Sequence, residues 1–201
     1  MLSCPESKNG EFSYTCLKKV HEKYQSTKGY LFINSDSLLK MWELNNLNFN
    51  IPWFSTIFKK TLIDTENEKN NINGLNELLK QKPDYEANLK KFISGNGFIK
   101  GSSDFYYLPI DKMRKFLDIS ADMYRNNVPS DVAVINTFAI MMEEEYIAFE
   151  IKPLNDEEKK NVMYHLKNDH DQIFIRPFDL ENEEVRNHLK NYVLAHSVDS
   201  Y

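Results

Sequence analysis

The sequence has few of the residues from which covalent cross-links and metal centres are built. Its 201 residues include only two cysteines, Cys4 and Cys16, which are too few for a disulfide framework and lack metal-ligand spacing. They are expected either to form one bridge in an oxidising compartment or to be two reduced thiols. The five histidines show no His-Glu-x-x-His spacing, so we interpret them as ordinary solvated side chains.

Long apolar runs and an excess of positive charge are also missing. No run approaches the roughly 18 apolar residues that a transmembrane helix requires, so no membrane span is expected in this chain. The formal net charge of -5 argues against a nucleic-acid-binding protein, although a local basic patch is left open. Residues 1–6 lack the charged and apolar regions of a signal peptide.

What the chain does contain is typical of one folded domain. Hydrophobic residues make up 41% of it, and its 11 Tyr and 13 Phe argue against disorder over the whole length. A length of 201 residues predicts a single domain, residues 1–201, with a sizeable core. Segment 64–73 has almost no apolar content and is expected to be a solvated loop.

Hydrophobic periodicity predicts an α/β fold with a mixed sheet flanked by helices. Ser130 or Asp131 is the expected N-cap of a buried helix, because the residues that follow are apolar nearly all round. Strands are expected at 29–33, twice within 98–109, at 146–151 and at 171–178. Helices are expected at about 12–25, 75–79, 85–93, 110–126, 132–142, 155–166 and 181–192.

The Asn-rich segment 45–54 reads NNLNFNIPWF. Alternation that ends in proline predicts a loop or an edge strand rather than a core element. Trp53 and Phe54 are expected to pack in the core or under a lid, with the lining of a site as the alternative.

The chain is organised around residues 29–42, which read GYLFINSDSLLKMW. The apolar run predicts a buried strand of a mixed or parallel sheet, and Asp36 follows it where open α/β sheets bind ligands. The Asn-Ser-Asp-Ser cluster is also ordinary helix N-cap chemistry, which is the commoner use of such residues. The amphipathic segment 38–42 predicts the first turns of a following helix.

Four ordered segments resemble a GT-A-type glycosyltransferase-like family of eukaryotes. Residues 29–42 are similar to the family form G-Y-L-F-x-x-D-D-x-L-x-x-x-W, and 101–109 to S-D-x-x-Y-I-P. Residues 130–137 are similar to L-E-I-A-I-P-T, and 173–180 to F-I-H-P-I-K-L. The resemblance covers most of residues 12–180 and implies a GT-A-like mixed sheet.

The resemblance implies a nucleotide-sugar-dependent transferase acting on an unknown acceptor, glycan or protein. In such enzymes an acidic pair holds Mn²⁺, which neutralises the departing diphosphate. Ser35 and Asp36 fall on that pair, so Asp36 is the implied metal ligand. Asp131 falls on the carboxylate that acts on the acceptor hydroxyl as general base or orients it. Arg176 falls on a histidine of the metal or diphosphate site, and Asp104 is the second implied cofactor-binding residue.

Two departures from the family pattern bear on activity. A serine and an arginine replace a carboxylate and a histidine, which weakens a cation site and favours an anion held without metal. The nucleotide-binding half that normally precedes the acidic pair is largely absent, so the chain is expected to be truncated at its N-terminus or degenerate. The alternative is a non-enzymatic protein–protein interaction module. An unrelated hydrolase ranks below both, because the chain has no G-x-S-x-G or Cys/His signature.

The implied compartment depends on how much of the protein this chain represents. The resemblance implies the Golgi or ER lumen. A chain that is complete as given would instead be expected in the cytoplasm. Donor sugar, acceptor and oligomeric state carry no signal in the sequence.

Overall fold

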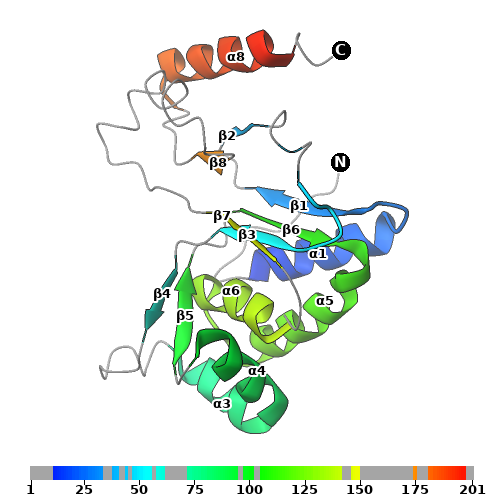
Figure 1. Cartoon of the computed structure of the whole chain (residues 1–201), viewed down its shortest axis with the longest axis vertical. Helices are drawn as coiled ribbons and strands as arrows, with labels where there is room; N and C mark the ends of the chain where they lie inside the picture. The colour runs from blue at the N-terminus through cyan, green and yellow to red at the C-terminus, as the bar shows by residue number, and fades with distance from the viewer. Residues whose placement is uncertain are drawn as a thin grey trace.

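The computed structural model describes residues 11–33, 38–40, 44, 47–55, 58–61, 72–94, 97–101, 105–141, 146–149, 174–175 and 181–197. These form six helices and eight short strands arranged as a mixed α/β structure (Figure 1). The coarse prediction of a mixed sheet flanked by helices is therefore confirmed. The helix predicted at 155–166 lies outside the described residues.

The main sheet has four strands in the order β1-β6-β3-β7. β1 (Gly29–Ile33) pairs antiparallel with β6 (Phe105–Pro109), and β6 pairs antiparallel with β3 (Trp53–Ser55). β7 (Ile147–Phe149) runs parallel to β3, which makes the sheet mixed. Within the described sheet β1 is an edge strand paired only in the antiparallel sense, and most of its residues are half-buried, whereas the apolar run predicted a buried strand.

β3 corrects the prediction only for the end of the Asn-rich segment, because the strand begins at Trp53. It has hydrogen-bonded neighbours on both sides, β6 and β7, so it is an inner strand and not a loop or an edge. Trp53 is 0% exposed and Phe54 is also buried, which confirms core packing for both side chains. The asparagines before β3 form a turn, as their local preference predicts, and the strand starts where two large aromatic rings become buried.

Two further ladders lie outside the main sheet. β2 (Leu38–Leu39) pairs antiparallel with β8 (Phe174–Ile175), so the helical turn predicted for segment 38–42 is wrong at its start. β4 (Phe58–Thr61) pairs antiparallel with β5 (Phe98–Gly101). Both strands predicted within 98–109 are thereby confirmed as β5 and β6.

Most of the described helices lie close to the residue ranges predicted from hydrophobic periodicity. α1 (Glu11–Lys23) and α5 (Ile110–Arg125) pack together and cover one face of the sheet, with α6 (Ser130–Met141) beside α5. α3 (Asn73–Gln81) and α4 (Pro83–Ile93) form the far end of the molecule in Figure 1, and α8 (Glu183–Ser197) forms the opposite end. Residues 64–71 of the predicted solvated loop lie outside the described residues, and its last two positions differ from the prediction, since Ile72 is fully buried and Asn73 begins α3.

α6 begins slightly differently from the prediction. The Pro129 carbonyl accepts the first backbone hydrogen bonds, from Val132 N at 3.0 Å and from Ala133 N at 2.7 Å. Pro129 thus takes the N-cap position that we assigned to Ser130 or Asp131, and both of those residues lie in the first turn.

The core lies between the sheet and α5–α6. Phe138 of α6 is its centre, with ring centroids 5.3 Å from Phe54, 5.5 Å from Tyr106 and 5.0 Å from Phe116. Fully burying such a side chain contributes about 1.5–3 kcal/mol. Strands from both halves of the chain therefore converge on one helix.

Asn136 is a polar residue at the heart of this apolar helix, and it is 0% exposed. Its side-chain oxygen accepts a hydrogen bond from Ile99 N at 3.1 Å, and its Nδ2 donates to Ile99 O at 2.6 Å. The same nitrogen donates to Val132 O within α6 at 2.6 Å. The amide thus occupies both backbone groups of Ile99 in β5 and fastens that strand to α6.

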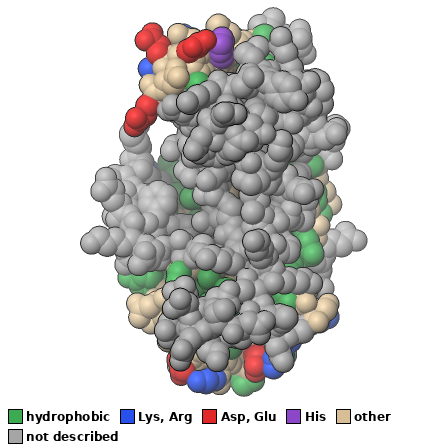
Figure 2. Space-filling model, turned by 90° about the vertical axis from the view of Figure 1, so that its left-hand side faces the viewer, with side chains coloured by type: hydrophobic (Ala, Val, Ile, Leu, Met, Phe, Trp, Pro, Cys, Tyr) green, Lys and Arg blue, Asp and Glu red, His purple; other side chains and the backbone are tan. Residues whose placement is uncertain are grey.

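Charged side chains gather at the two ends of the molecule. On the face that Figure 2 shows, the end formed by α8 carries acidic side chains with a basic side chain and a histidine, and the end formed by α3 and α4 carries both acidic and basic side chains. The α3–α4 end has helical ion pairs, Lys80–Glu77 at 2.7 Å and Lys90–Glu86 at 2.7 Å. Such exposed pairs contribute little to stability, so this end is an ordinary solvated surface.

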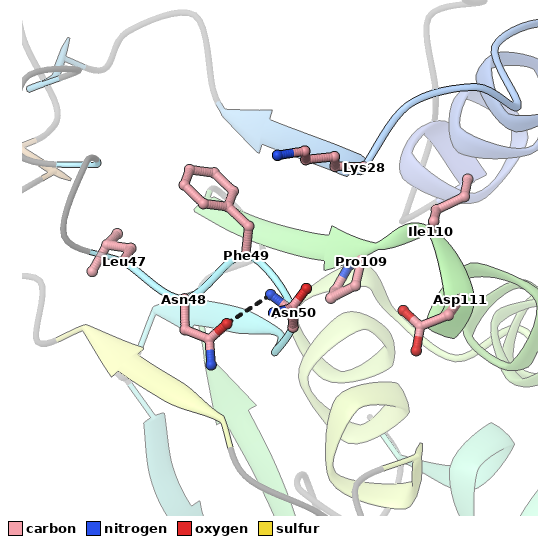
Figure 3. Close-up of a pocket in the computed structure, with 8 residues that line it drawn as sticks. All are labelled: Lys28, Leu47, Asn48, Phe49, Asn50, Pro109, Ile110 and Asp111. Atoms are coloured by element: carbon pink, nitrogen blue, oxygen red, sulfur yellow. Dashed lines mark hydrogen bonds between the residues drawn. The ribbon is translucent and has the colours of Figure 1, made fainter.

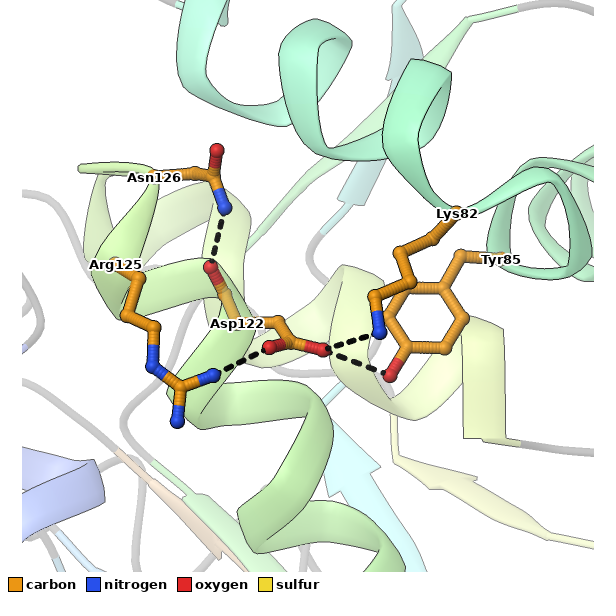
Figure 4. Close-up of polar contacts among 5 residues, drawn as sticks. All are labelled: Lys82, Tyr85, Asp122, Arg125 and Asn126. Atoms are coloured by element: carbon orange, nitrogen blue, oxygen red, sulfur yellow. Dashed lines mark hydrogen bonds and ion pairs between the residues drawn. The ribbon is translucent and has the colours of Figure 1, made fainter.

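One charged cluster joins α4 to α5 (Figure 4). The Tyr85 hydroxyl donates to Asp122 Oδ2 at 3.1 Å, and Arg125 Nη1 lies 2.8 Å from Asp122 Oδ1. Lys82 Nζ lies 3.6 Å from the same carboxylate. Burial, the hydrogen bond to Asp122 and the charges of Asp122 and Asp118 raise the pKa of Tyr85 to about 12. The cluster is explained by helix–helix attachment, without a ligand.

This raised pKa predicts an alkaline signature for Tyr85→Phe. Tyrosine ionises near pH 10 in the unfolded chain, whereas folded Tyr85 holds its proton to about pH 12. The stabilising effect of Tyr85 should therefore be complete below pH 10 and be lost between pH 10 and 12. The melting temperature of the unmodified chain should fall more steeply over that interval than that of Tyr85→Phe. The exposed Tyr24→Phe is the control and should follow the unmodified chain; equal slopes for Tyr85→Phe would contradict the assignment.

Candidate functional site

Four of the five positions implied by the resemblance lie outside the described residues: Ser35, Asp36, Asp104 and Arg176. The backbone of Asp131 is described, in the first turn of α6. The geometry that bears on the other four comes from the paired residues that flank them in the chain.

The β1·β6 ladder limits the separation of two of these positions. Ile33, the last residue of β1, is paired with Phe105, the first residue of β6. Asp104 directly precedes Phe105, and Asp36 follows Ile33 by three residues. Three residues span at most about 10 Å. The described chain neighbours of both carboxylates, Ile33 and Phe105, thus lie at the same end of the ladder.

The β2·β8 ladder adds the third position. Leu38, two residues after Asp36, is paired with Ile175, which directly precedes Arg176. Asp36 therefore belongs to the four-residue connection between β1 and β2. The partner of β1, β6, begins directly after Asp104, and the partner of β2, β8, ends directly before Arg176. The pairings bring together the chain neighbours of one cationic and two acidic candidates, which are far apart in sequence. We call this end of the ladders the acidic edge.

The carboxyl ends of β3 and β7 lie at this same edge. β3 is antiparallel to β6 in the register Phe54↔Tyr106, and β7 is parallel to β3. The acidic edge is therefore where three strands, β1, β3 and β7, end. Asp131 belongs to a different element, a helix that packs on α4, α5 and β5.

Lys40 is a buried charged residue that sequence reasoning missed. It directly follows β2 and is only 2% exposed. Lysine is almost never buried to this extent without a polar partner, and buried lysines are frequent in functional sites. The only signal in the sequence was a single basic residue inside an apolar segment.

Metal and membrane features can be judged for part of the chain. Where side chains are described, no three His, Cys, Asp or Glu residues are grouped closely enough to hold a metal ion. No described helix is both long and apolar enough to cross a bilayer. Cys16 is buried in α1 and is disulfide-bonded, which agrees with the first of the two states expected for the cysteines.

A cavity of about 600 Å³ lies at the other end of the sheet (Figure 3). Lys28 before β1, the turn Asn48–Asn50 before β3, and the junction Pro109–Asp111 between β6 and α5 line it. The β1·β6 ladder separates this cavity from the acidic edge by about 14 Å of strand. No residue that lines it was predicted to form a site, because it draws on three segments distant in sequence.

Comparison with known proteins leaves the family open. No family model, no curated protein and no solved structure matches this chain.

Proposed function

We propose that this chain is a glycosyltransferase-like protein that binds a nucleotide-sugar at the acidic edge. The proposal rests on the four segments that resemble GT-A-type enzymes, which also imply the lumen of the Golgi or ER. The observation that supports it most is the register of the two ladders, Ile33↔Phe105 and Leu38↔Ile175. That register gathers the neighbours of Asp36, Asp104 and Arg176, as a site shared by these residues requires.

The charges of these residues favour recognition of a diphosphate by arginine. Arg176 would pair with phosphate oxygens through its planar fork of N–H donors. Asp36 is the residue that would hold Mn²⁺, Asp104 is the second residue proposed to bind the cofactor, and the ion would supply neutralisation of the departing diphosphate. A site with serine at 35 and arginine at 176 has lost ligands, so we expect weak dependence on the metal. Asp131 is the proposed general base toward the acceptor hydroxyl.

Calorimetric titration with a panel of nucleotide-sugars, each with and without Mn²⁺, tests the proposal. We expect one donor to bind, and Arg176→Ala to weaken it at least tenfold because a charge-assisted phosphate contact is lost. Asp36→Asn should remove any enhancement by Mn²⁺. Arg125→Ala, which removes an exposed arginine elsewhere, is the matched control and should bind like the unmodified chain. Absence of binding by every donor would rule out donor recognition by this chain.

A non-enzymatic interaction module is the second candidate, and α8 supplies the observation for it. This helix carries Glu183 and Glu184 in its first turn and exposes Val193 and Leu194 near its other end. A pair of exposed aliphatic residues on a helix that also carries acidic residues is compatible with a protein-binding surface. A stoichiometric partner captured from the native host by the unmodified chain, and lost with Leu194→Ser, would favour this function over transfer.

A further inference from the structure

The cavity at the far end of the sheet is lined by the turn Asn48–Asn50, which buried aromatic residues hold in place through hydrogen bonds. Trp53 Nε1 donates a hydrogen bond to Asn48 O at 2.8 Å, and the Tyr107 hydroxyl donates to Phe49 O at 3.0 Å. Asn50 N donates to Asn48 Oδ1 at 2.9 Å, which closes the turn locally. Burial and the charge of Asp111 raise the pKa of Tyr107, so its hydroxyl keeps the proton that it donates.

Phe49 is presented to solvent by this turn. Its ring lies 4.7 Å from that of Trp53 and 5.4 Å from that of Tyr107, yet the residue is 38% exposed. Two buried rings pack against it, and Phe49 is one of the residues that line the cavity (Figure 3). An aromatic side chain that is immobilised and still exposed provides a flat apolar surface that loses little entropy when a ligand covers it.

The polar groups around Phe49 suit a ligand that is rich in hydroxyls. The amides of Asn48 and Asn50 each combine donor and acceptor groups, as a hydroxyl does. Lys28 and Asp111 bring one charge of each sign to the lining, and Lys112 Nζ lies 3.8 Å from Asp111 Oδ2 just outside it. Opposite charges disfavour a strongly anionic or cationic ligand, and four polar side chains disfavour a purely apolar one.

We propose that this cavity is a saccharide-binding subsite, in which Phe49 covers the apolar face of a neutral sugar ring. Asn48, Asn50 and Asp111 hydrogen-bond the ring hydroxyls, and Lys28 donates from the opposite side. A volume of about 600 Å³ is in the range of small-ligand sites. The subsite is independent of donor binding, because it lies at the opposite end of the β1·β6 ladder from the acidic edge.

Saturation-transfer NMR on the full chain tests this with the methyl glycosides of glucose, galactose, mannose and N-acetylglucosamine as probes. At least one probe should receive saturation at its ring C–H protons, and Phe49→Ala should weaken its binding at least tenfold. Asn50→Ala, an exposed change that keeps the backbone bond of the turn, should weaken it severalfold. Tyr24→Ala removes another exposed aromatic residue and should leave binding unchanged.

Two results would overturn the subsite. One is no saturation transfer to any of the four probes by a folded chain. The other is binding that survives both Phe49→Ala and Asn50→Ala. Neither result depends on nucleotide-sugar titrations. Saturation-transfer NMR therefore tests the subsite, and calorimetric titration tests the proposed transferase function, independently of each other.

Discussion

Asn136→Leu should lower the free energy of unfolding by about 3–5 kcal/mol. Leucine is close to asparagine in size but leaves Ile99 N and Ile99 O without their side-chain partners. A buried backbone group that loses its hydrogen bond costs about 1–3 kcal/mol, and two such groups are affected. Asn136→Asp should be at least as damaging, because a carboxylate cannot donate to Ile99 O and is itself costly to bury.

Urea unfolding followed by circular dichroism measures this effect, with Asn187→Leu as the matched control. Asn187 lies on the exposed side of α8, so its replacement should change stability by no more than about 0.5 kcal/mol. Hydrogen exchange adds a local readout: the Ile99 amide should exchange much faster in Asn136→Leu. Equal stability of the two leucine variants would show that Asn136 does not fasten β5 to α6.

Gly29→Ala should destabilise the chain by about 3 kcal/mol or more. A Cβ atom at residue 29 would lie 2.5 Å from Tyr107 Cζ and 2.6 Å from Leu108 O. The ring of Tyr107 is buried and tied to Phe49 O, and Leu108 O belongs to the backbone of β6, so neither can yield cheaply. Overpacking of this kind costs about 1–3 kcal/mol, and here it also disturbs the pairing of β1 with β6.

Thermal unfolding of Gly29→Ala and of the exposed Ser26→Ala separates this clash from a general effect of a new alanine around the start of β1. The Gly29 variant should melt well below the unmodified chain, whereas the Ser26 variant should not. The Gly29 variant should also bind saccharide probes more weakly, because Tyr107 holds the turn that carries Phe49. A Gly29 variant with unchanged melting temperature would mean that β1 and β6 are not packed this closely.

The helices could be predicted from the sequence because their signal is local. Apolar residues recur every three or four positions, and α1, α4 and α5 lie within two residues of their expected limits. β3 was missed because its flanking asparagines and Pro52 are typical of a loop, while its burial depends on strands more than 50 and 90 residues later in the chain. β2 was missed for the same reason, since its partner, β8, is more than 130 residues away.

The candidate site residues also divide into those with a local sequence signal and those that depend on contacts distant in sequence. Asp36, Asp104, Asp131 and Arg176 were found as local motifs, and their roles stay predictions. The ladders that pair the chain neighbours of three of them, and the cavity around Phe49, depend on pairings that no local pattern contains. Lys40 and Asn136 were hidden because a polar residue in an apolar segment does not show whether it faces solvent or a buried partner.

Thiol cross-linking tests most directly whether the acidic edge gathers its residues. Asp36→Cys and Arg176→Cys are combined in one chain and treated with a short bis-maleimide, and the linked peptides are identified by mass spectrometry. The unmodified chain measures the reactivity of the native cysteines, and Asp36→Cys with Asp111→Cys provides a pair at opposite ends of the β1·β6 ladder. We predict rapid linkage of 36 to 176 and little linkage of 36 to 111. Linkage of 36 to 176 that is no faster than that of 36 to 111 would contradict the proposed site.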